Sequence, residues 1–173
     1  MNISVKTPAD PRLLATPSGF IALGMGSGLS PFAPGTAGSL AALPMAWYLK
    51  LLPLPHYALI VLLATLLGFY VCDVVGKALK VHDHGAIVWD EFCGLWLGLM
   101  LIPRHWLWLV IGFFLFRLFD IVKPWPARWF DRHMSNGVGV MLDDIAAGVW
   151  TLLALWGLEW LLRTNSWSFW GLI

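Results

Sequence analysis

The amino-acid sequence predicts an all-α protein: a polytopic bundle of about four to five membrane-spanning helices that follows a Gly/Pro-rich N-terminal segment. Hydrophobic residues make up 59% of the 173 residues and charged residues only 12%, about half the charged fraction of an ordinary soluble domain. The twelve Trp residues fit a bilayer, because indole rings collect at membrane interfaces. A net charge of +1 gives no polybasic surface. We therefore expect membrane lipids as partners and no nucleic acid.

Five apolar segments are the expected spans, and short polar or proline-containing breaks separate them. They run at about residues 37–52, 57–75, 87–102, 106–122 and 138–162. The second has a clean membrane-spanning length, whereas the third is short and carries two acids near its start. We expect a single membrane-embedded domain over residues 18–164, with a polar tail at residues 1–17 and a short interfacial tail at residues 165–173.

The segment before the first span, GFIALGMGSGLSPFAPGTAGS, is apolar but dense in Gly and Pro. Non-helical backbone survives at membrane depth only where protein or water covers it, so this segment is a candidate re-entrant loop. It lacks the Lys of a phosphate-binding P-loop. Thr36 or Ser39 could cap the first span and leave backbone N–H groups free for an anion. Tight helix packing explains Gly38 equally well.

Charged residues divide unevenly between two faces once consecutive spans alternate in direction. Nine of the ten acids fall on one face, and only Glu159 falls on the other. Eight of the eleven basic residues share the acid-rich face: Lys6, Arg12, Lys77, Lys80, Arg117, Lys123, Arg128 and Arg132. By the positive-inside rule this face is cytoplasmic. The unusual polar segments therefore converge on one membrane surface.

Two pairs of consecutive acids, Asp90-Glu91 and Asp143-Asp144, stand near the starts of the third and fifth spans. The helix macrodipole explains one acid at a helix N-terminus, but it explains two consecutive acids on two helices poorly. Clustered carboxylates repel one another unless a cation lies between them, and hard oxygen ligands suit Mg²⁺. We therefore expect these four acids to form a metal site.

Basic residues gather around the end of the fourth span, in FRLFDIVKPWPARWFDRH. Arg117 and Asp120 are three residues apart on one helix face, where a self-contained ion pair is as good an interpretation as a functional site. Arg117 and Lys123 are placed to hold an anionic headgroup beside the carboxylates. Arg132 is better explained as an anchor at the membrane interface.

A polar loop, His82-Asp83-His84, precedes the third span. Loop histidines are most often simply solvated, although near a metal-phosphate site they could shuttle a proton. We count Asp83 among the catalytic candidates.

Four motifs taken together resemble the phosphatidylglycerophosphatase A family of bacterial lipid phosphatases. They are GSGLSPFAPGTAGSL, HDHGAIVWDE, FRLFDIVKPWP and GVGVMLDDIAAG. The resemblance implies Mg²⁺-dependent hydrolysis of phosphatidylglycerophosphate to phosphatidylglycerol and phosphate, in phospholipid synthesis at the cytoplasmic face of the bacterial inner membrane. In that reading the four paired acids bind metal and carry catalysis, while Arg117, Lys123, Thr36 and Ser39 bind the substrate phosphate.

The alternative from another functional class is a small ion-coupled transporter, because intramembrane acids and broken helices also mark transport sites. Two observations count against it. The chain has no inverted repeat, and its charges gather at one face instead of the membrane midplane. The sequence makes no prediction of oligomeric state.

Overall fold

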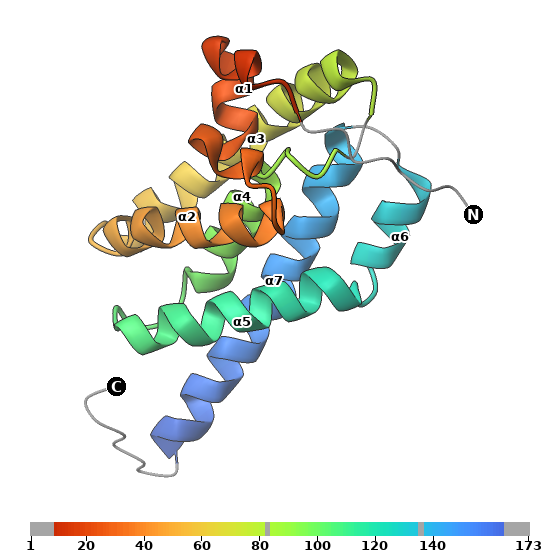
Figure 1. Ribbon diagram of the computed structural model, residues 1–173. Coiled ribbons are helices and arrows are strands. Elements are labelled where there is room, and N and C mark those ends of the chain that lie inside the picture. The colour runs from red at the N-terminus through yellow and green to blue at the C-terminus, as the bar shows by residue number, and fades with distance from the viewer. Residues whose placement is uncertain (1–8, 82–83, 135–136, 165–173) are drawn as a thin grey trace.

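A computed structural model describes residues 9–81, 84–134 and 137–164, and within these residues the chain forms helices, turns and connecting segments without strands (Figure 1). The all-α prediction is therefore confirmed for the described residues. The helices are η1 (Pro11–Ala15), α1 (Pro17–Ala22), η2 (Gly24–Leu29), α2 (Pro34–Leu49), α3 (Leu54–Leu79), α4 (Trp89–Leu99), α5 (Trp106–Val122), α6 (Ala127–His133) and α7 (Gly137–Thr164).

Two helices of the described chain, α3 and α7, are long and apolar enough to cross a membrane. They have 26 and 28 residues, whereas α2, α4 and α5 have 16, 11 and 17. A helix needs about 20 apolar residues to cross the hydrocarbon core of a bilayer. The predicted count of four to five spans therefore stays a prediction.

Helix α4 lies at the centre of the bundle and packs against α2, α3, α5 and α7 (Figure 1). Its Phe92, Leu95 and Leu99 are completely buried. Two of its tryptophans also point into the bundle. Trp89 Nε1 donates to the Ala64 carbonyl at 3.0 Å and Trp96 Nε1 to Ala42 at 3.1 Å. These indoles therefore stabilise helix packing, and the interfacial role expected of the tryptophans does not apply to them.

Helices α4 and α7 approach each other closely, because glycines leave no side chains between the two backbones. A Cβ atom on Gly94 would lie 2.5 Å from the Asp144 carbonyl oxygen, and one on Gly98 would lie 2.9 Å from Cβ of Thr151. Gly148 faces the Gly94 carbonyl in the same way. Small residues permit this backbone contact between apolar helices. We call Gly94, Gly98, Gly148 and Thr151 the glycine seam.

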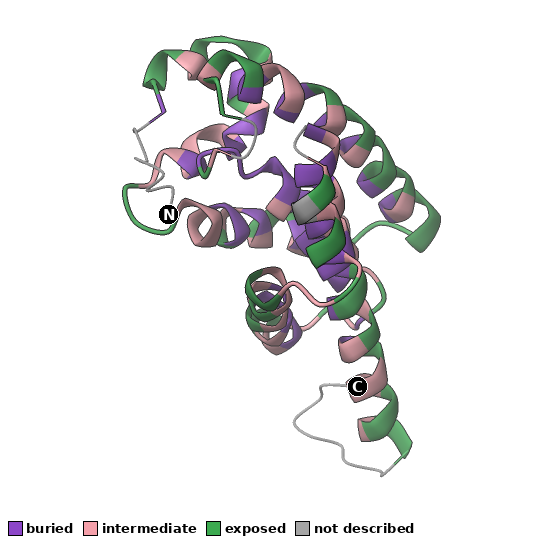
Figure 2. Cartoon of the chain, turned by 90° about the vertical axis from the view of Figure 1, so that its right-hand side faces the viewer, coloured by how far each residue is buried: buried purple, intermediate pink, exposed green. Residues whose placement is uncertain are grey.

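Buried positions line the inner faces of the helices around this seam, and exposed positions line the outward faces (Figure 2). The C-terminal half of α7 extends beyond the other helices in both views (Figures 1 and 2). Its outward residues are large and apolar, among them Trp156 and Trp160. Such a surface fits lipid contact, which the membrane prediction requires.

The Gly/Pro-rich segment folds into α1 and η2 and packs beside the residues that precede α4. The Val88 N–H donates to the Ala22 carbonyl at 2.9 Å. Gly28 lies so close to the Ala86 carbonyl that no side chain would fit at position 28. Ala33, with a φ of 44°, turns the chain into α2. Gly24 and Gly28 in this segment are buried, whereas Pro31, Phe32 and Ala33 are exposed. The protein therefore covers only part of the irregular backbone, and the re-entrant loop stays a prediction.

Candidate functional site

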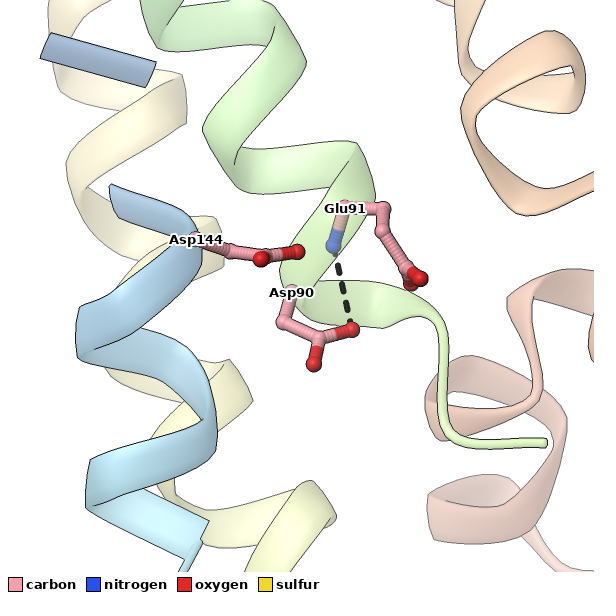
Figure 3. A group of neighbouring side chains, drawn as sticks. All are labelled: Asp90, Glu91 and Asp144. Carbon is pink, nitrogen blue, oxygen red and sulfur yellow. Dashed lines mark hydrogen bonds between the residues drawn. The ribbon is translucent and has the colours of Figure 1, made fainter. Parts of the chain in front are cut away.

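Three carboxylates from two helices point toward one another. Asp90 and Glu91 come from the first turn of α4, and Asp144 comes from α7 (Figure 3). Each offers an oxygen atom, and these oxygens all lie within 4.8 Å of one another. The Glu91 N–H donates to Asp90 Oδ1 at 3.0 Å, which fixes the orientation of the Asp90 carboxylate. We call Asp90, Glu91 and Asp144 the carboxylate triad.

The glycine seam explains why the triad is so compact. Gly94 lies one helical turn after Asp90, and its missing side chain lets the Asp144 backbone touch α4. The Asp144 side chain therefore emerges beside the first turn of α4. Tight packing of apolar helices holds together three groups that would repel one another when ionised.

The triad is also poorly solvated. Asp90 is 6% exposed and Asp144 is 4% exposed. A cation lies beside the triad: Nη1 of Arg117 on α5 is 3.8 Å from Glu91 Oε1 and 2.7 Å from Asp120 Oδ2. Among the described residues, Glu91 Oε2 and the Nε and Nη1 atoms of Arg117 are buried without a well-aligned hydrogen bond. Buried polar atoms without partners are rare in folded proteins, and they fit a site that binds an ion or water.

The fourth predicted acid, Asp143, takes a different partner. Its Oδ2 atom accepts a hydrogen bond from Lys123 Nζ at 2.5 Å. Lys123 ends α5 in the left-handed conformation, with a φ of 48°, and its side chain reaches the start of α7. The structure therefore brings Asp90, Glu91 and Asp144 together, and it pairs Asp143 with the predicted phosphate-binding Lys123.

Two residues of the site were not identified from the sequence. Asp120, which the sequence suggested only as a partner for Arg117, also interacts electrostatically with Glu91 and Asp144. Its spacing of three residues from Arg117 was the available signal. Gly35, in the first turn of α2, lies directly against the Glu91 carboxylate and the Arg117 guanidinium. No local pattern in the sequence distinguishes this glycine from its neighbours.

The remaining predicted residues lie around this centre or outside the described chain. Thr36 follows Gly35 in the first turn of α2, a helix whose N-terminus has no side-chain cap. Ser39 is fully buried and donates to the Gly35 carbonyl at 2.9 Å, so its hydroxyl is used within α2. His84 Nδ1 accepts from the Ala86 N–H at 3.2 Å. His82 and Asp83 lie outside the described residues.

Comparison with known proteins places the chain in a family. Residues 20–159 match the family model described as phosphatidylglycerophosphatase A. The chain belongs to the phosphatidylglycerophosphatase A family. An Escherichia coli K12 protein of that name is 50% identical over 146 residues, which cover 83% of this chain and 85% of the relative. A Haemophilus influenzae protein of the same name is 42% identical over 152 residues, covering 86% and 93%.

A third relative has a different name. It is a Bacteroides thetaiotaomicron protein provisionally named a phosphatidylinositol-3-phosphatase, 39% identical over 150 residues that cover 82% of this chain and 93% of the relative. No solved structure matches the chain.

The triad of this phosphatidylglycerophosphatase A family member has the donor chemistry of a divalent cation site. It supplies hard carboxylate oxygens at mutual distances that one ion can bridge, and such oxygens favour Mg²⁺, Mn²⁺ or Ca²⁺ over softer metals. Arg117 lies beside Glu91 of the triad, Lys123 contacts the neighbouring Asp143, and both side chains offer N–H groups to an anion. The residues therefore fit an arrangement in which a cation and an anionic group bind next to each other.

Proposed function

We propose that this chain is a Mg²⁺-dependent lipid phosphatase, which hydrolyses phosphatidylglycerophosphate to phosphatidylglycerol and inorganic phosphate in bacterial phospholipid synthesis. The observation that carries the proposal is the buried carboxylate triad beside Arg117, in a chain of the phosphatidylglycerophosphatase A family. A phosphomonoester is highly charged and has a poor leaving group. Its hydrolysis therefore requires neutralised phosphoryl oxygens and an oriented nucleophile.

Each side chain of the site has a role in this reaction. Asp90, Glu91 and Asp144 would hold Mg²⁺, which when bound supplies positive charge next to the phosphoryl oxygens. Arg117 offers its planar fork to two of those oxygens. When water attacks phosphorus, the bond to the glycerol oxygen breaks. A carboxylate of the site accepts the water proton and returns a proton to the departing oxygen, which leaves as the alcohol.

The N-terminal turn of α2 would also contribute to binding the phosphate. Gly35 and Thr36 belong to the first turn of this helix, whose N–H groups have no partners within the helix itself, and Gly35 already lies against Arg117. The positive end of a helix dipole and free N–H groups favour a bound anion. Lys123, held by Asp143, adds a further positive charge near the start of α7.

We further infer a multi-pass protein of the bacterial inner membrane with its active site facing the cytoplasm. Residues of the site come from the starts of α2, α4 and α7 and from the end of α5. Alternating spans would bring these four ends to one membrane surface, the same surface that carries most basic residues. Cysteine labelling tests this topology. The loops at 76–86 and 123–137 should react from the cytoplasm, and the turn at 103–105 from outside.

Phosphate release from purified protein in detergent micelles tests the activity. Phosphatidylglycerophosphate should be hydrolysed with Mg²⁺ and should not be hydrolysed after chelation. Phosphatidylinositol 3-phosphate belongs in the same assay because the third relative is named for that substrate. If the protein hydrolysed neither lipid, the proposal would be contradicted. A transporter is not favoured, since the curated relatives above are named as phosphatases.

A further inference from the structure

Gly35 occupies the point where α2 comes closest to the carboxylate triad. A Cβ atom at this position would lie closer to Glu91 Oε1 than a carbon and an oxygen atom can approach. The same atom would also lie 3.3 Å from Nη1 and 3.4 Å from Nη2 of Arg117. The backbone of α2 at Gly35 therefore lies next to Glu91, which is expected to bind the cation, and next to Arg117, which is expected to bind the phosphate.

Gly35 differs from Gly28, Gly94 and Gly148 in the kind of atom that an added Cβ would meet. At Gly28, Gly94 and Gly148 an added Cβ would meet backbone carbonyl oxygens, which cannot move without shifting a whole segment. At Gly35 it would meet the end of a flexible glutamate. An alanine here can therefore be accommodated by rotation of Glu91, at the expense of the triad geometry.

Glycine is also a poor helix former, second only to proline, and Gly35 lies within the first turn of α2. Gly35 has no left-handed φ that would account for its presence. Its neighbour Glu91 needs an external support, since Glu91 Oε2 is buried without a hydrogen bond and Arg117 is 3.8 Å from Oε1. The Gly35 backbone lies close enough to restrict the positions of this carboxylate.

We propose that Gly35 is a positioning residue for the reaction: the absence of a side chain directs the Glu91 carboxylate toward Asp90 and Asp144 and keeps it beside Arg117. The inference rests on the proposed function, because it treats Glu91 as a cation ligand. It predicts a distinctive phenotype for Gly35→Ala, in which the protein folds normally but binds the cation weakly.

The test uses the full chain in detergent micelles and compares Gly35→Ala with Gly157→Ala. Gly157 is also helical, but an added Cβ there has nothing within 4 Å. We expect Gly35→Ala to weaken Mn²⁺ binding, measured by calorimetry, by about 10- to 100-fold, the range seen when the support of a metal ligand is lost. Its phosphate release should fall as well. Thermal unfolding without metal should match wild type, and Gly157→Ala should be normal in all three measurements.

A second variant tests the contact itself. Glu91→Asp shortens the side chain by one methylene and makes room beside position 35. If Gly35 acts through Glu91, Gly35→Ala should weaken Mn²⁺ binding much less in the Glu91→Asp background than in wild type. Equal fold-losses in the two backgrounds would overturn the proposal, as would normal Mn²⁺ affinity of Gly35→Ala. If Gly35→Ala fails to fold, the Glu91→Asp change should restore folding, and failure to do so would also overturn it.

The Mn²⁺ measurement separates this inference from the proposed function. A wild-type protein that binds Mn²⁺ but hydrolyses no lipid phosphate would contradict the phosphatase proposal, while the Gly35 comparison could still be made. A wild-type enzyme with full activity and a Gly35→Ala variant with unchanged Mn²⁺ affinity would leave the phosphatase proposal standing and remove only the role of Gly35.

Discussion

Helices α4 and α7 meet at two places with opposite chemistry. At the glycine seam their backbones touch, and the one hydroxyl of the seam is satisfied, since Thr151 Oγ1 donates to the Ala147 carbonyl at 2.8 Å. One turn away the same helices bring Asp90, Glu91 and Asp144 together, and there Glu91 Oε2 is buried without a hydrogen bond. The seam satisfies its polar groups, and the triad does not.

This difference separates the structural from the functional part of one helix pair. Close packing of the seam stabilises the bundle, and the same packing holds the triad in an arrangement that ionised carboxylates would not adopt alone. Proteins retain unfavourable local arrangements of this kind mainly at functional sites. Changes in the seam should therefore lower stability, whereas changes in the triad should lower activity and leave stability unchanged or increased.

The largest effect is expected from the triad. Asp144→Asn keeps the shape of the side chain but removes a negative charge and a hard ligand. A bound cation contributes several kcal/mol to transition-state stabilisation, so we expect phosphate release to fall roughly 10³-fold. Thermal unfolding without metal should occur at the wild-type temperature or above it, because repulsion with Asp90 is relieved. A folded variant with full Mg²⁺-dependent activity would rule out Asp144 as a ligand.

The seam should give the opposite result. Gly148→Ala forces a methyl group against the Gly94 carbonyl, and overpacking of this kind costs about 3 kcal/mol. We expect a lower unfolding free energy in denaturant titrations, together with a near-normal turnover for the fraction that remains folded. Gly157→Ala on the same helix is the control and should be neutral or slightly stabilising. Wild-type stability of Gly148→Ala would show that the backbone contact is less close than described.

Arg117 lies between the two cases, since it could serve either packing or chemistry. Arg117→Lys keeps the charge near Asp120 but loses the two-pronged geometry that matches phosphate oxygens. We expect normal Mn²⁺ binding, normal thermal unfolding and a turnover reduced about 10- to 100-fold, equivalent to about 1.4–2.7 kcal/mol. Steady-state kinetics decides the matter. Near-wild-type values would reduce Arg117 to a structural partner of Asp120.

The sequence predicted the five longer helices well, and it singled out acids that the structure brings together. Apolar length and proline breaks located α3, α5 and α7 within a few residues, because those signals are local. The acids Asp90, Glu91 and Asp144 were found because paired carboxylates in an apolar chain need compensation. Local patterns do not determine how a helix is rotated about its axis, and therefore which of its side chains face the site. Neighbouring helical residues point about 100° apart, so Asp143 and Asp144 are equivalent in sequence but not in the bundle.

The roles of Ser39 and Gly35 were beyond local patterns for a related reason. Whether a hydroxyl faces a ligand or its own backbone depends on the packing of the whole helix, and Ser39 bonds to the Gly35 carbonyl. Gly35 matters through its contact with Glu91, a residue 56 positions later in the chain. Such a contact is defined only once α2 and α4 are placed side by side.

The smallest effect is expected from the Lys123–Asp143 pair, and it gives the sharpest comparison because Asp143 and Asp144 are adjacent. The Lys123 and Asp143 side chains are 25% and 11% exposed, and their charged atoms are 2.5 Å apart. The pair is mostly buried, but an Asn at 143 keeps an oxygen that can accept from Lys123, so only the charge-assisted part of one hydrogen bond is lost, about 1 kcal/mol. Asp143→Asn should therefore lower the unfolding free energy by that amount. It should also reduce phosphate release less than tenfold, mainly by raising KM, because Lys123 loses its support but keeps its charge.

The comparison with Asp144→Asn then tests whether the four predicted acids divide into three metal ligands and one partner of Lys123. The two substitutions are chemically identical and one residue apart, yet we expect their effects on turnover to differ by about two orders of magnitude, or about 2.7 kcal/mol. Mn²⁺ affinity provides the independent readout, and it should be nearly unchanged in Asp143→Asn and strongly reduced in Asp144→Asn. Equal losses of metal binding in both variants would contradict the division. Asp143 would then have to leave Lys123 when the cation binds, and the metal site would comprise four carboxylates.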